Sequence, residues 1–408
     1  MNADLLITGI SQLVTARGRG PKHGAAMREV EVVNGAAMAI TGGGIAWIGA
    51  SSDWKGHASA TFDVEGRAVV PALIDPHTHA VWAGDRLADF DARTSGKSYE
   101  DILKAGGGIR SSIRATAAAT QAELIRLAAT RISSLLRSGA TTIEVKSGYG
   151  FTASAETAML EAIQALRATT PARLLSTLLI HIPPSDAIER AQYVANTYDD
   201  LIPEVARRRL ASAVDVFVEQ EAWHVEEAAQ ILECAKLHGM AIKLHTEQFQ
   251  RIGGLELGVR MGALSVDHLE ACAPGQLALL ASSSTIATIL PGVTLHLGIP
   301  AAPGRQLIDA GAAVAVGTDL NPGSSPLFST SAALGLAVRL NGLTASEALI
   351  AGTVNAACAL GLMDAGRLEV GLAADFLVLE GSDWRELVYT LGTNPVHDVW
   401  VRGQRVES

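Results

Sequence analysis

Cysteine is scarce in this sequence, and none of the cysteines is paired in a motif. The 408 residues include only three, Cys234, Cys272 and Cys358, and no CxxC spacing occurs. An odd number of isolated cysteines is typical of small buried side chains in a reducing compartment, and it indicates neither a disulfide framework nor a zinc knot. We therefore expect a cytoplasmic protein.

The features of membrane and nucleic-acid-binding proteins are also missing. No apolar run reaches the roughly 18 residues that a transmembrane helix needs, and residues 1–20 have no basic region ahead of their apolar residues. The formal net charge of -10 is dispersed, with no basic stripe. A nucleic-acid partner, a membrane partner and a secretory signal are therefore not expected.

The composition instead fits a compact α/β enzyme with a large and a small domain. Hydrophobic residues make up 48% of the chain, and glycine accounts for 40 residues. Short β segments separated by turns are predicted at both chain ends, at Asp4–Thr8, Glu29–Val33, Ala37–Thr41, Gly44–Ile48, Thr61–Val64, Ala374–Leu379 and His397–Val401, with turns at Asn34-Gly35 and Gly42-Gly43-Gly44. We expect residues 1–66 and 367–408 to form a small β-sandwich domain. Residues 67–366, between them in the chain, are expected to form the catalytic domain.

The centre of the chain alternates apolar runs of strand length with segments of helical spacing. Helical spacing is found at Gln121–Ser138, Ala155–Ala168, Val225–His238 and Gly254–Met261. Eight such β/α units in about 250 residues match a (β/α)₈ TIM barrel. An open doubly wound sheet is the alternative, but no G-x-G-x-x-G follows the first strand and opens a helix. The predicted strands are Val69–Ile74, Thr141–Val145, Leu174–Ile180, Ala213–Val218, Ala241–Leu244, Ala263–Val266, Thr285–Leu290 and Ala313–Val316.

Polar side chains stand where these predicted strands end, which is where a TIM barrel carries its chemistry. In the stretch Pro71–Arg86, His77 and His79 lie two residues apart, and in an extended segment such residues face the same side. Of the 11 histidines in the chain, five fall at predicted strand ends. The strand-end residues are His77, His79, Lys146–Tyr149, His181, Glu219, His245, His268 and Asp319.

Three imidazoles and a carboxylate from this group, those of His77, His79, His245 and Asp319, suit one Zn²⁺, Fe²⁺ or Fe³⁺ ion that lowers the pKa of a bound water. A bridged pair of ions is not expected, because the fourth strand offers no lysine. His268 is expected to act as a general base with Asp319, although it could instead complete the metal shell. In isolation, His245 could be a strand-end histidine bonded to a carbonyl and Asp319 a turn-capping carboxylate.

The segments that carry these residues resemble the amidohydrolase superfamily and, within it, the imidazolonepropionase family. They read DPHTHAVWAGDR, GKSYEDILKAGGGI, GATTIEVKSGYG, IKLHTEQF, SVDHLE and AVGTDLNPGSSP. The resemblance implies hydrolysis of the cyclic amide of 4-imidazolone-5-propanoate to N-formimino-L-glutamate in histidine degradation, with one zinc or iron ion. It also implies a small-molecule substrate and a homodimer.

The same resemblance implies a set of substrate contacts. An arginine with a tyrosine hydroxyl is a good receptor for the propanoate, whereas His181 is placed to polarise the ring carbonyl. Each has a plainer alternative, such as an Arg86 salt bridge or a structural role for His181. Whether Gln248 or its neighbour Glu247 faces the substrate is left open. The implied contacts are Arg86, Tyr149, His181, Gln248, Asn321, Gly323 and Ser324.

Two other functions compete with this interpretation. A deaminase of purine-like rings would use the same metal ligands but would not need an arginine and a tyrosine for a propanoate. A barrel without catalytic activity would have no reason to keep an open metal site. Metal binding and the preferred substrate therefore distinguish the three hypotheses.

Overall fold

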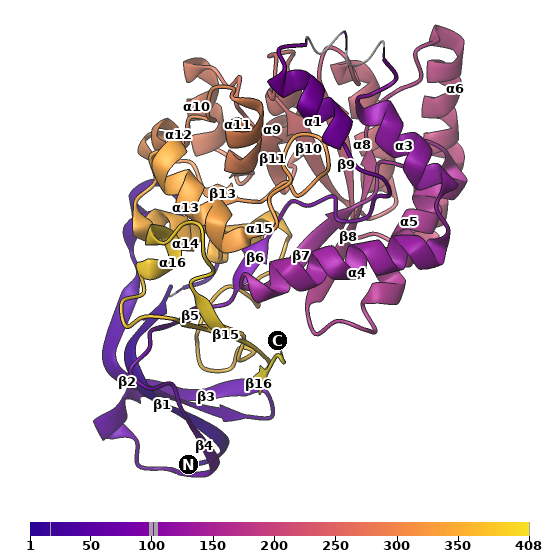
Figure 1. The fold of residues 1–408 in the computed structure, drawn as a ribbon. Coiled ribbons are helices and arrows are strands. Elements are labelled where there is room, and N and C mark those ends of the chain that lie inside the picture. Colours follow the sequence, from indigo (N-terminus) through magenta and orange to yellow (C-terminus); the bar gives the residue numbers. More distant parts are fainter. Residues whose placement is uncertain (17, 98–100, 102–104, 408) are drawn as a thin grey trace.

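A computed structural model describes residues 1–16, 18–97, 101 and 105–407, and it contains two eight-stranded sheets. In Figure 1 the central sheet and its helices, coloured from magenta to orange, form the larger body. The indigo strands of the N-terminal region lie beside the yellow strands of the C-terminal region in the smaller body. Part of the segment Gly96–Ile109, at residues 98–100 and 102–104, lies outside the described residues.

The central sheet is the expected barrel. Its strands follow one another in chain order and every neighbouring pair is parallel. A parallel bridge between Thr78 and Leu320 links the ends of the first and last strands. The strands are β6 (Leu73–Asp75), β7 (Ala140–Lys146), β8 (Arg173–Ile180), β9 (Ala213–Val218), β10 (Ala241–Thr246), β11 (Ser265–His268), β12 (Ile286–Ile289) and β13 (Val314–Val316).

Amphipathic helices cover the outside of the barrel. In α4 (Gln121–Arg137), Leu124, Ala128, Ile132 and Leu135 form one buried face, and the Thr120 side chain caps the helix by accepting a bond from Glu123 N. All four helices predicted above are present, with ends that differ by two residues or fewer. The other helices around the barrel are α3 (Ile109–Ala118), α5 (Ala153–Leu166), α6 (Ala187–Asn196), α7 (Ile202–Arg207), α8 (Val225–Leu237), α9 (Gly254–Met261), α10 (Pro274–Ala281), α11 (Pro291–Leu297), α12 (Gly304–Ala310), α13 (Thr330–Leu340), α14 (Ala345–Ala351) and α15 (Val354–Ala359).

The second sheet is built from both chain ends, as expected, but it is one continuous sheet that curls around its own core. Its order is β16-β15-β14-β5-β1-β2-β3, with β4 paired to β1. The rings of Phe62 on β4 and Trp400 on β15 lie 5.0 Å apart although other strands separate them in the sheet. The strands are β1 (Asn2–Thr15), β2 (Glu31–Thr41), β3 (Gly44–Ala50), β4 (His57–Asp63), β5 (Val69–Pro71), β14 (Phe376–Leu379), β15 (Val396–Val401) and β16 (Gln404–Arg405).

Two local predictions differ from the structure. The expected turn at Asn34-Gly35 is wrong, because β2 runs through it and accommodates Gly35, with φ +58°, near an irregularity in its pairing with β1. The apolar run Val69–Ile74 is two strands: β5 pairs with β1 and β14 in the terminal sheet, whereas β6 opens the barrel. The terminal sheet therefore extends past residue 66. The division of the chain into two domains stays a proposal.

No helix among the described residues is both long enough and apolar enough to cross a membrane.

One buried carboxylate ties the connection between β1 and β2 to the barrel helices. Glu347 on α14 accepts bonds from Arg28, at the end of a short helix (Gly24–Arg28), and from Arg305 on α12, both at 3.0 Å or less. Burial alone would raise the pKa of Glu347, but the bonds from Arg305, Thr344 and Arg28 lower it to about 2. The ionised carboxylate is therefore the form that the fold stabilises.

This pairing predicts a pH-dependent stability defect in Glu347→Gln. Because the folded-state pKa lies below the unfolded one, the stabilisation is complete above about pH 4.5 and is lost as the pH falls toward 2. We expect the variant to lose about 1–2 kcal/mol of unfolding free energy at pH 7, since both arginines are partly solvated. Urea unfolding at pH 7 and pH 3 measures the free energy of unfolding of the wild type and the variant. The control Asp309→Asn, in an exposed pair with the same Arg305, should change that free energy little. A Glu347→Gln defect that did not shrink at pH 3 would contradict the assignment.

Candidate metal centre

Backbone pairing at the closure of the barrel brings the first and last strands together at their carboxyl ends. Asp319 N donates to His77 O at 3.0 Å, and His79 N donates to Leu320 O at 2.9 Å. The buried Asp75 carboxylate reinforces this seam by accepting bonds from the backbone N and the hydroxyl of Thr318, at 3.1 and 2.7 Å. Residues 240 positions apart in the chain are thereby held against each other.

The four expected metal ligands converge at this seam. One ring nitrogen from each of His77, His79 and His245 lies within 4.8 Å of the other two. Asp319 Oδ1 lies 3.4 Å from His77 Nε2 and 3.2 Å from His79 Nε2. All four side chains are buried. The arrangement predicted from strand ends is therefore present as geometry, while the role of each residue stays a proposal.

The donor atoms in this cluster fit a bound cation. His77 Nε2 and Asp319 Oδ1 are buried without a hydrogen-bond partner. His79 Nε2 and His245 Nε2 face each other at 3.3 Å. Lone pairs gathered in a dry interior are costly unless a proton or a cation joins them. Three imidazoles and one carboxylate form a donor set that Zn²⁺ and iron accept.

Two carboxylates that sequence reasoning missed stand behind the histidines. His77 Nδ1 lies 2.6 Å from Asp267 Oδ2, and His245 Nδ1 lies 3.0 Å from Asp215 Oδ2. The Asp267 bond favours the tautomer of His77 whose Nε2 lone pair is free for a metal, and it fixes the plane of that ring. His245 Nδ1 makes no hydrogen bond with Asp215, but the backbone N of His245 donates to Asp215 Oδ1 at 3.1 Å. In β9 the missed signal was a single charged residue, Asp215, in an otherwise apolar strand, and in β11 it was Asp267 directly before His268.

Strained backbone marks three of the strand ends. Glu247, His268 and Asp319 have φ values of +57°, +86° and +51°, a region that residues other than glycine rarely adopt. Each follows or ends a barrel strand at the rim that carries the cluster. Such backbone is costly and persists only where the surrounding structure holds it, which is common at functional sites.

His268 is close enough to the cluster for either of its expected roles. One of its ring nitrogens, one of His77 and one carboxylate oxygen of Asp319 lie within 4.8 Å of one another. Its Nδ1 is 3.5 Å from Glu270 Oε2, and both side chains are buried. The position suits a general base beside Asp319 and also suits a further ligand.

Tyr149 and His181 line the same site on its other side. The ring of His181 stacks on His79 at 5.7 Å and lies 5.7 Å from that of Tyr149. The Tyr149 loop is held from beneath by Glu156, which accepts bonds from Gly148 N, Gly150 N and Phe151 N at 2.7 to 2.9 Å. Burial and the Asp319 charge raise the pKa of Tyr149, so it keeps its proton.

His181 has a defined tautomer in this setting. Its Nδ1 lies 3.2 Å from Gly148 O, and a carbonyl only accepts, so Nδ1 carries the hydrogen. Desolvation and the nearby His79 lower the pKa of His181 to about 3. At neutral pH the ring is therefore uncharged and Nε2 is an acceptor.

Arg86 and the Asn321–Ser324 turn face each other beside the cluster. Arg86 pairs with Asp89, the plainer alternative considered above, and its guanidinium also lies against Gly323. Asn321 organises the turn: its Oδ1 accepts from Gly323 N and Ser324 N, both at 2.8 Å, and its Nδ2 donates to Asp319 Oδ2 at 2.9 Å. Asn321 therefore orients Asp319, and substrate contacts by this turn stay a prediction.

The structure separates Glu247 from the histidine cluster. Its Oε1 accepts a bond from Gln276 on α10 at 3.3 Å, so its carboxylate packs among the covering helices. Burial raises the pKa of Glu247 to about 7. Gln248, the next residue, is 8% exposed at the same strand end. Of the two, Gln248 remains the candidate for a substrate contact.

Comparison with known proteins agrees with this geometry. The profile of the amidohydrolase family matches residues 68–406. The imidazolonepropionase of Deinococcus deserti is 60% identical over 403 residues, which cover 99% of this chain and 100% of the relative. The chain belongs to the imidazolonepropionase family of amidohydrolases. The imidazolonepropionase of Deinococcus radiodurans is 58% identical over 404 residues, covering 99% of this chain and 100% of that one.

Solved structures show the same amidohydrolase fold at low sequence identity. An adenosine deaminase from Xanthomonas campestris with bound zinc superposes with a TM-score of 0.73 at 19% identity, covering 99% of this chain and 93% of that chain. At such identity only the fold is shared, so the deaminase alternative gains nothing from it. The imidazolonepropionase relatives and the buried histidine and aspartate cluster together indicate a metal-dependent enzyme.

The metal centre predicts a specific loss of bound metal in His245→Ala. Removing one imidazole leaves three donors, and we expect metal affinity to fall by more than the about 10–100-fold that loss of an outer partner costs. Elemental analysis after dialysis against a weak chelator measures the bound metal. His238→Ala changes an exposed histidine and should keep the wild-type content. Equal metal content in both variants would remove His245 from the ligand set.

Proposed function

We propose that the protein hydrolyses the cyclic amide of 4-imidazolone-5-propanoate to N-formimino-L-glutamate, a step of histidine degradation. The carrying observation is the convergence of four buried donor atoms beside Tyr149, His181 and Arg86, in a chain 60% identical to an imidazolonepropionase. The deaminase alternative is disfavoured, because a neutral purine-like ring needs no carboxylate receptor.

His77, His79, His245 and Asp319 would hold one zinc or iron ion. When bound, the ion supplies a Lewis acid that lowers the pKa of a coordinated water and polarises a carbonyl. Both metals accept a donor set of three imidazoles and a carboxylate, and the choice between them is not part of the proposal.

His268 and Asp319 manage the proton of the attacking water. Asp319 stays ionised: burial alone would raise its pKa, but the adjacent His77 and His79 rings hold that pKa well below its usual range. As the water oxygen adds to the ring carbonyl carbon, its proton passes to this pair. When the ring carbon–nitrogen bond breaks, the pair returns the proton to the leaving nitrogen.

His181 acts as a hydrogen-bond acceptor, since its Nε2 carries a lone pair in the tautomer described above. The sequence-based expectation that it polarises the ring carbonyl would need a hydrogen on Nε2. We propose instead that His181 Nε2 accepts a hydrogen bond from the ring N–H of the substrate. This bond would orient the N–H beside the reacting carbonyl. The ring of His181 lies nearly parallel to that of His79, with 5.7 Å between the ring centroids, so it stands next to the ligands.

The propanoate is assigned to Arg86 and Tyr149. The Arg86 charge reaches Tyr149, where it acts to lower the pKa of the phenol against the larger effect of burial. A guanidinium and a neutral hydroxyl together bind a carboxylate through charge-assisted bonds. Gln248, Asn321, Gly323 and Ser324 are assigned to the other polar groups of the substrate.

The proposal also covers the domain division, the location and the oligomeric state of the protein. Residues 1–66 with 367–408 are proposed as the small domain and residues 67–366 as the catalytic domain, with β5 crossing into the terminal sheet. A cytoplasmic location is supported by the three unpaired cysteines. A homodimer is supported by the apolar composition, and sedimentation of the purified protein tests it.

Asp319→Ala should abolish turnover. The change removes a metal ligand and half of the proton-handling pair, so we expect kcat to fall about 10³-fold or more. Loss of absorbance from freshly generated imidazolone propanoate reports the reaction. Asp364→Ala, at an exposed carboxylate, is the control. A chelator should inhibit the wild type, and added metal should restore it. Wild-type protein that leaves the substrate unchanged under every metal condition refutes the proposed function.

Arg86→Ala should mainly raise KM. Loss of one charge-assisted bond to the propanoate is worth about 1.5–3 kcal/mol, which corresponds to a KM about 10–100-fold higher with kcat little changed. Steady-state kinetics measure both constants. Arg114→Ala, an exposed arginine on α3, is the matched control. An unchanged KM would remove Arg86 from the carboxylate receptor.

A further inference from the structure

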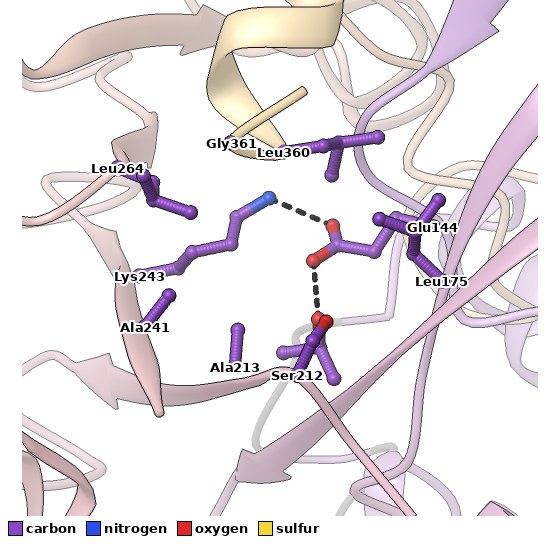
Figure 2. A pocket seen from close by; sticks show the side chains of 10 residues that line it. Glu144, Leu175, Ser212, Ala213, Ala241, Lys243, Leu264, Leu360 and Gly361 are labelled. Carbon is purple, nitrogen blue, oxygen red and sulfur yellow. Dashed lines mark hydrogen bonds and ion pairs between the residues drawn. The ribbon is translucent and has the colours of Figure 1, made fainter. Parts of the chain in front are cut away.

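Beneath the metal centre, two lysines are buried inside the barrel. Lys146 on β7 and Lys243 on β10 are 0% and 1% exposed, and they are paired with the carboxylates of Glu144, Asp215 and Asp267. Figure 2 shows Lys243 extended toward Glu144 across the amino ends of the strands. The proposed reaction uses none of these side chains, yet buried charges are costly unless their pairing serves the structure around them.

Lys146 contacts the two carboxylates that stand behind the metal ligands. Its Nζ lies 2.7 Å from Asp215 Oδ2 and 3.7 Å from Asp267 Oδ2. These are the same oxygen atoms that face His245 Nδ1 at 3.0 Å and His77 Nδ1 at 2.6 Å. A single ammonium therefore contacts both carboxylates at the oxygens that lie against the two histidines. Glu144 Oε2, at 2.8 Å, holds that ammonium in turn.

We propose that Lys146 is a positioning residue that, through Asp215 and Asp267, sets the orientation of His245 and His77 for metal binding. This inference rests on the metal centre proposed above. It assigns to one buried lysine the coupling of two ligands that come from different strands, β6 and β10.

The physical reason is the loss of the cation that holds Asp215. Lys146 Nζ lies 2.7 Å from Asp215 Oδ2, whereas Lys243 contacts Glu144 and Asp267 but not Asp215. Without Lys146, the buried Asp215 carboxylate has no ammonium partner in the described part of the chain, and we expect it to turn away. Its hold on the His245 backbone N–H then weakens, and His245 is no longer fixed for metal binding.

A purely electrostatic role for Lys146 would have the opposite sign. Removing a cation near a metal site makes that site more negative, which by Coulomb attraction strengthens metal binding. Loss of orientation weakens metal binding instead. The direction in which metal affinity changes when Lys146 is replaced therefore distinguishes a positioning role from a purely electrostatic one.

Lys243 offers a matched control. It carries the same charge in the same interior, donates to Pro76 O at 2.9 Å, and lies 2.8 Å from Glu144 and 3.7 Å from Asp267. Among its contacts in the described part of the chain, none is with Asp215, the carboxylate behind His245. It also borders a cavity of about 210 Å³ at the amino ends of the strands, so a substituted side chain has room there (Figure 2).

The test compares Lys146→Met and Lys243→Met by zinc affinity, measured by competition with a chelator at pH 7.5 on the full-length chain. We expect the affinity of Lys146→Met to fall about 10–100-fold. Lys243→Met should keep the wild-type affinity or exceed it. An affinity of Lys146→Met at or above the wild-type value overturns the proposal, as does an equal loss in the two variants.

A second variant keeps the test decisive if Lys146→Met does not fold, as judged by circular dichroism. Asp215→Asn preserves shape and an oxygen for the His245 backbone N–H, but it turns an amide toward Lys146 and breaks their pair. It should lose zinc affinity about 10–100-fold, whereas wild-type affinity in Asp215→Asn overturns the proposal. A wild-type chain that binds no zinc refutes the metal centre itself. A wild type that binds zinc while Lys146→Met is unaffected refutes only the role of Lys146.

Discussion

Four buried donor atoms meet at the closure of the barrel, and the rest of the site is built around them. Three imidazoles and a carboxylate lie together in the interior, where their lone pairs are costly unless a proton or a cation joins them. The barrel meets this condition with backbone bonds between its first and last strands, which place His77 and His79 against Asp319. Behind the rings, Asp267 favours the His77 tautomer whose Nε2 faces the other donors, and Asp215 holds the backbone of His245.

The surroundings of the donors suit the opening of a small ring that carries a charged propanoate. A neutral His181 fixed by the Gly148 carbonyl, a protonated Tyr149 and an ionised Asp319 are three different protonation states held within one site. Their differences arise from burial and neighbouring charge rather than from residue type alone. Ring opening needs groups in different protonation states, because one group must take a proton while others only orient the substrate.

Much of this site could be predicted from the sequence, because in a parallel barrel all strands end on one rim. Finding the strands was therefore nearly enough to find His77, His181, His245 and Asp319. The position of Glu247 depended on a turn with positive φ that no pattern of apolar residues encodes. The split of Val69–Ile74 between two sheets could not be predicted from the sequence either, since both halves are buried and apolar.

The charged network below the site could not be predicted by looking only at strand ends. Lys146 follows a predicted strand, but Asp215 and Lys243 lie within barrel strands and Asp267 lies next to the end of one, where a charge is easily taken for a solvent-facing residue. A usable signal exists: Glu144 and Lys146, like Lys243 and His245, alternate at a spacing of two and so share one face of a strand. Pairing such faces across neighbouring strands requires the register, which only the structure supplies.

X-ray absorption spectroscopy of the zinc-loaded protein tests most directly whether these histidines and this aspartate bind one ion. We expect nitrogen and oxygen neighbours at about 2.0–2.2 Å from the zinc, with the multiple-scattering pattern of several imidazoles. A shell containing sulfur at about 2.3 Å, or one without imidazole scattering, would contradict it.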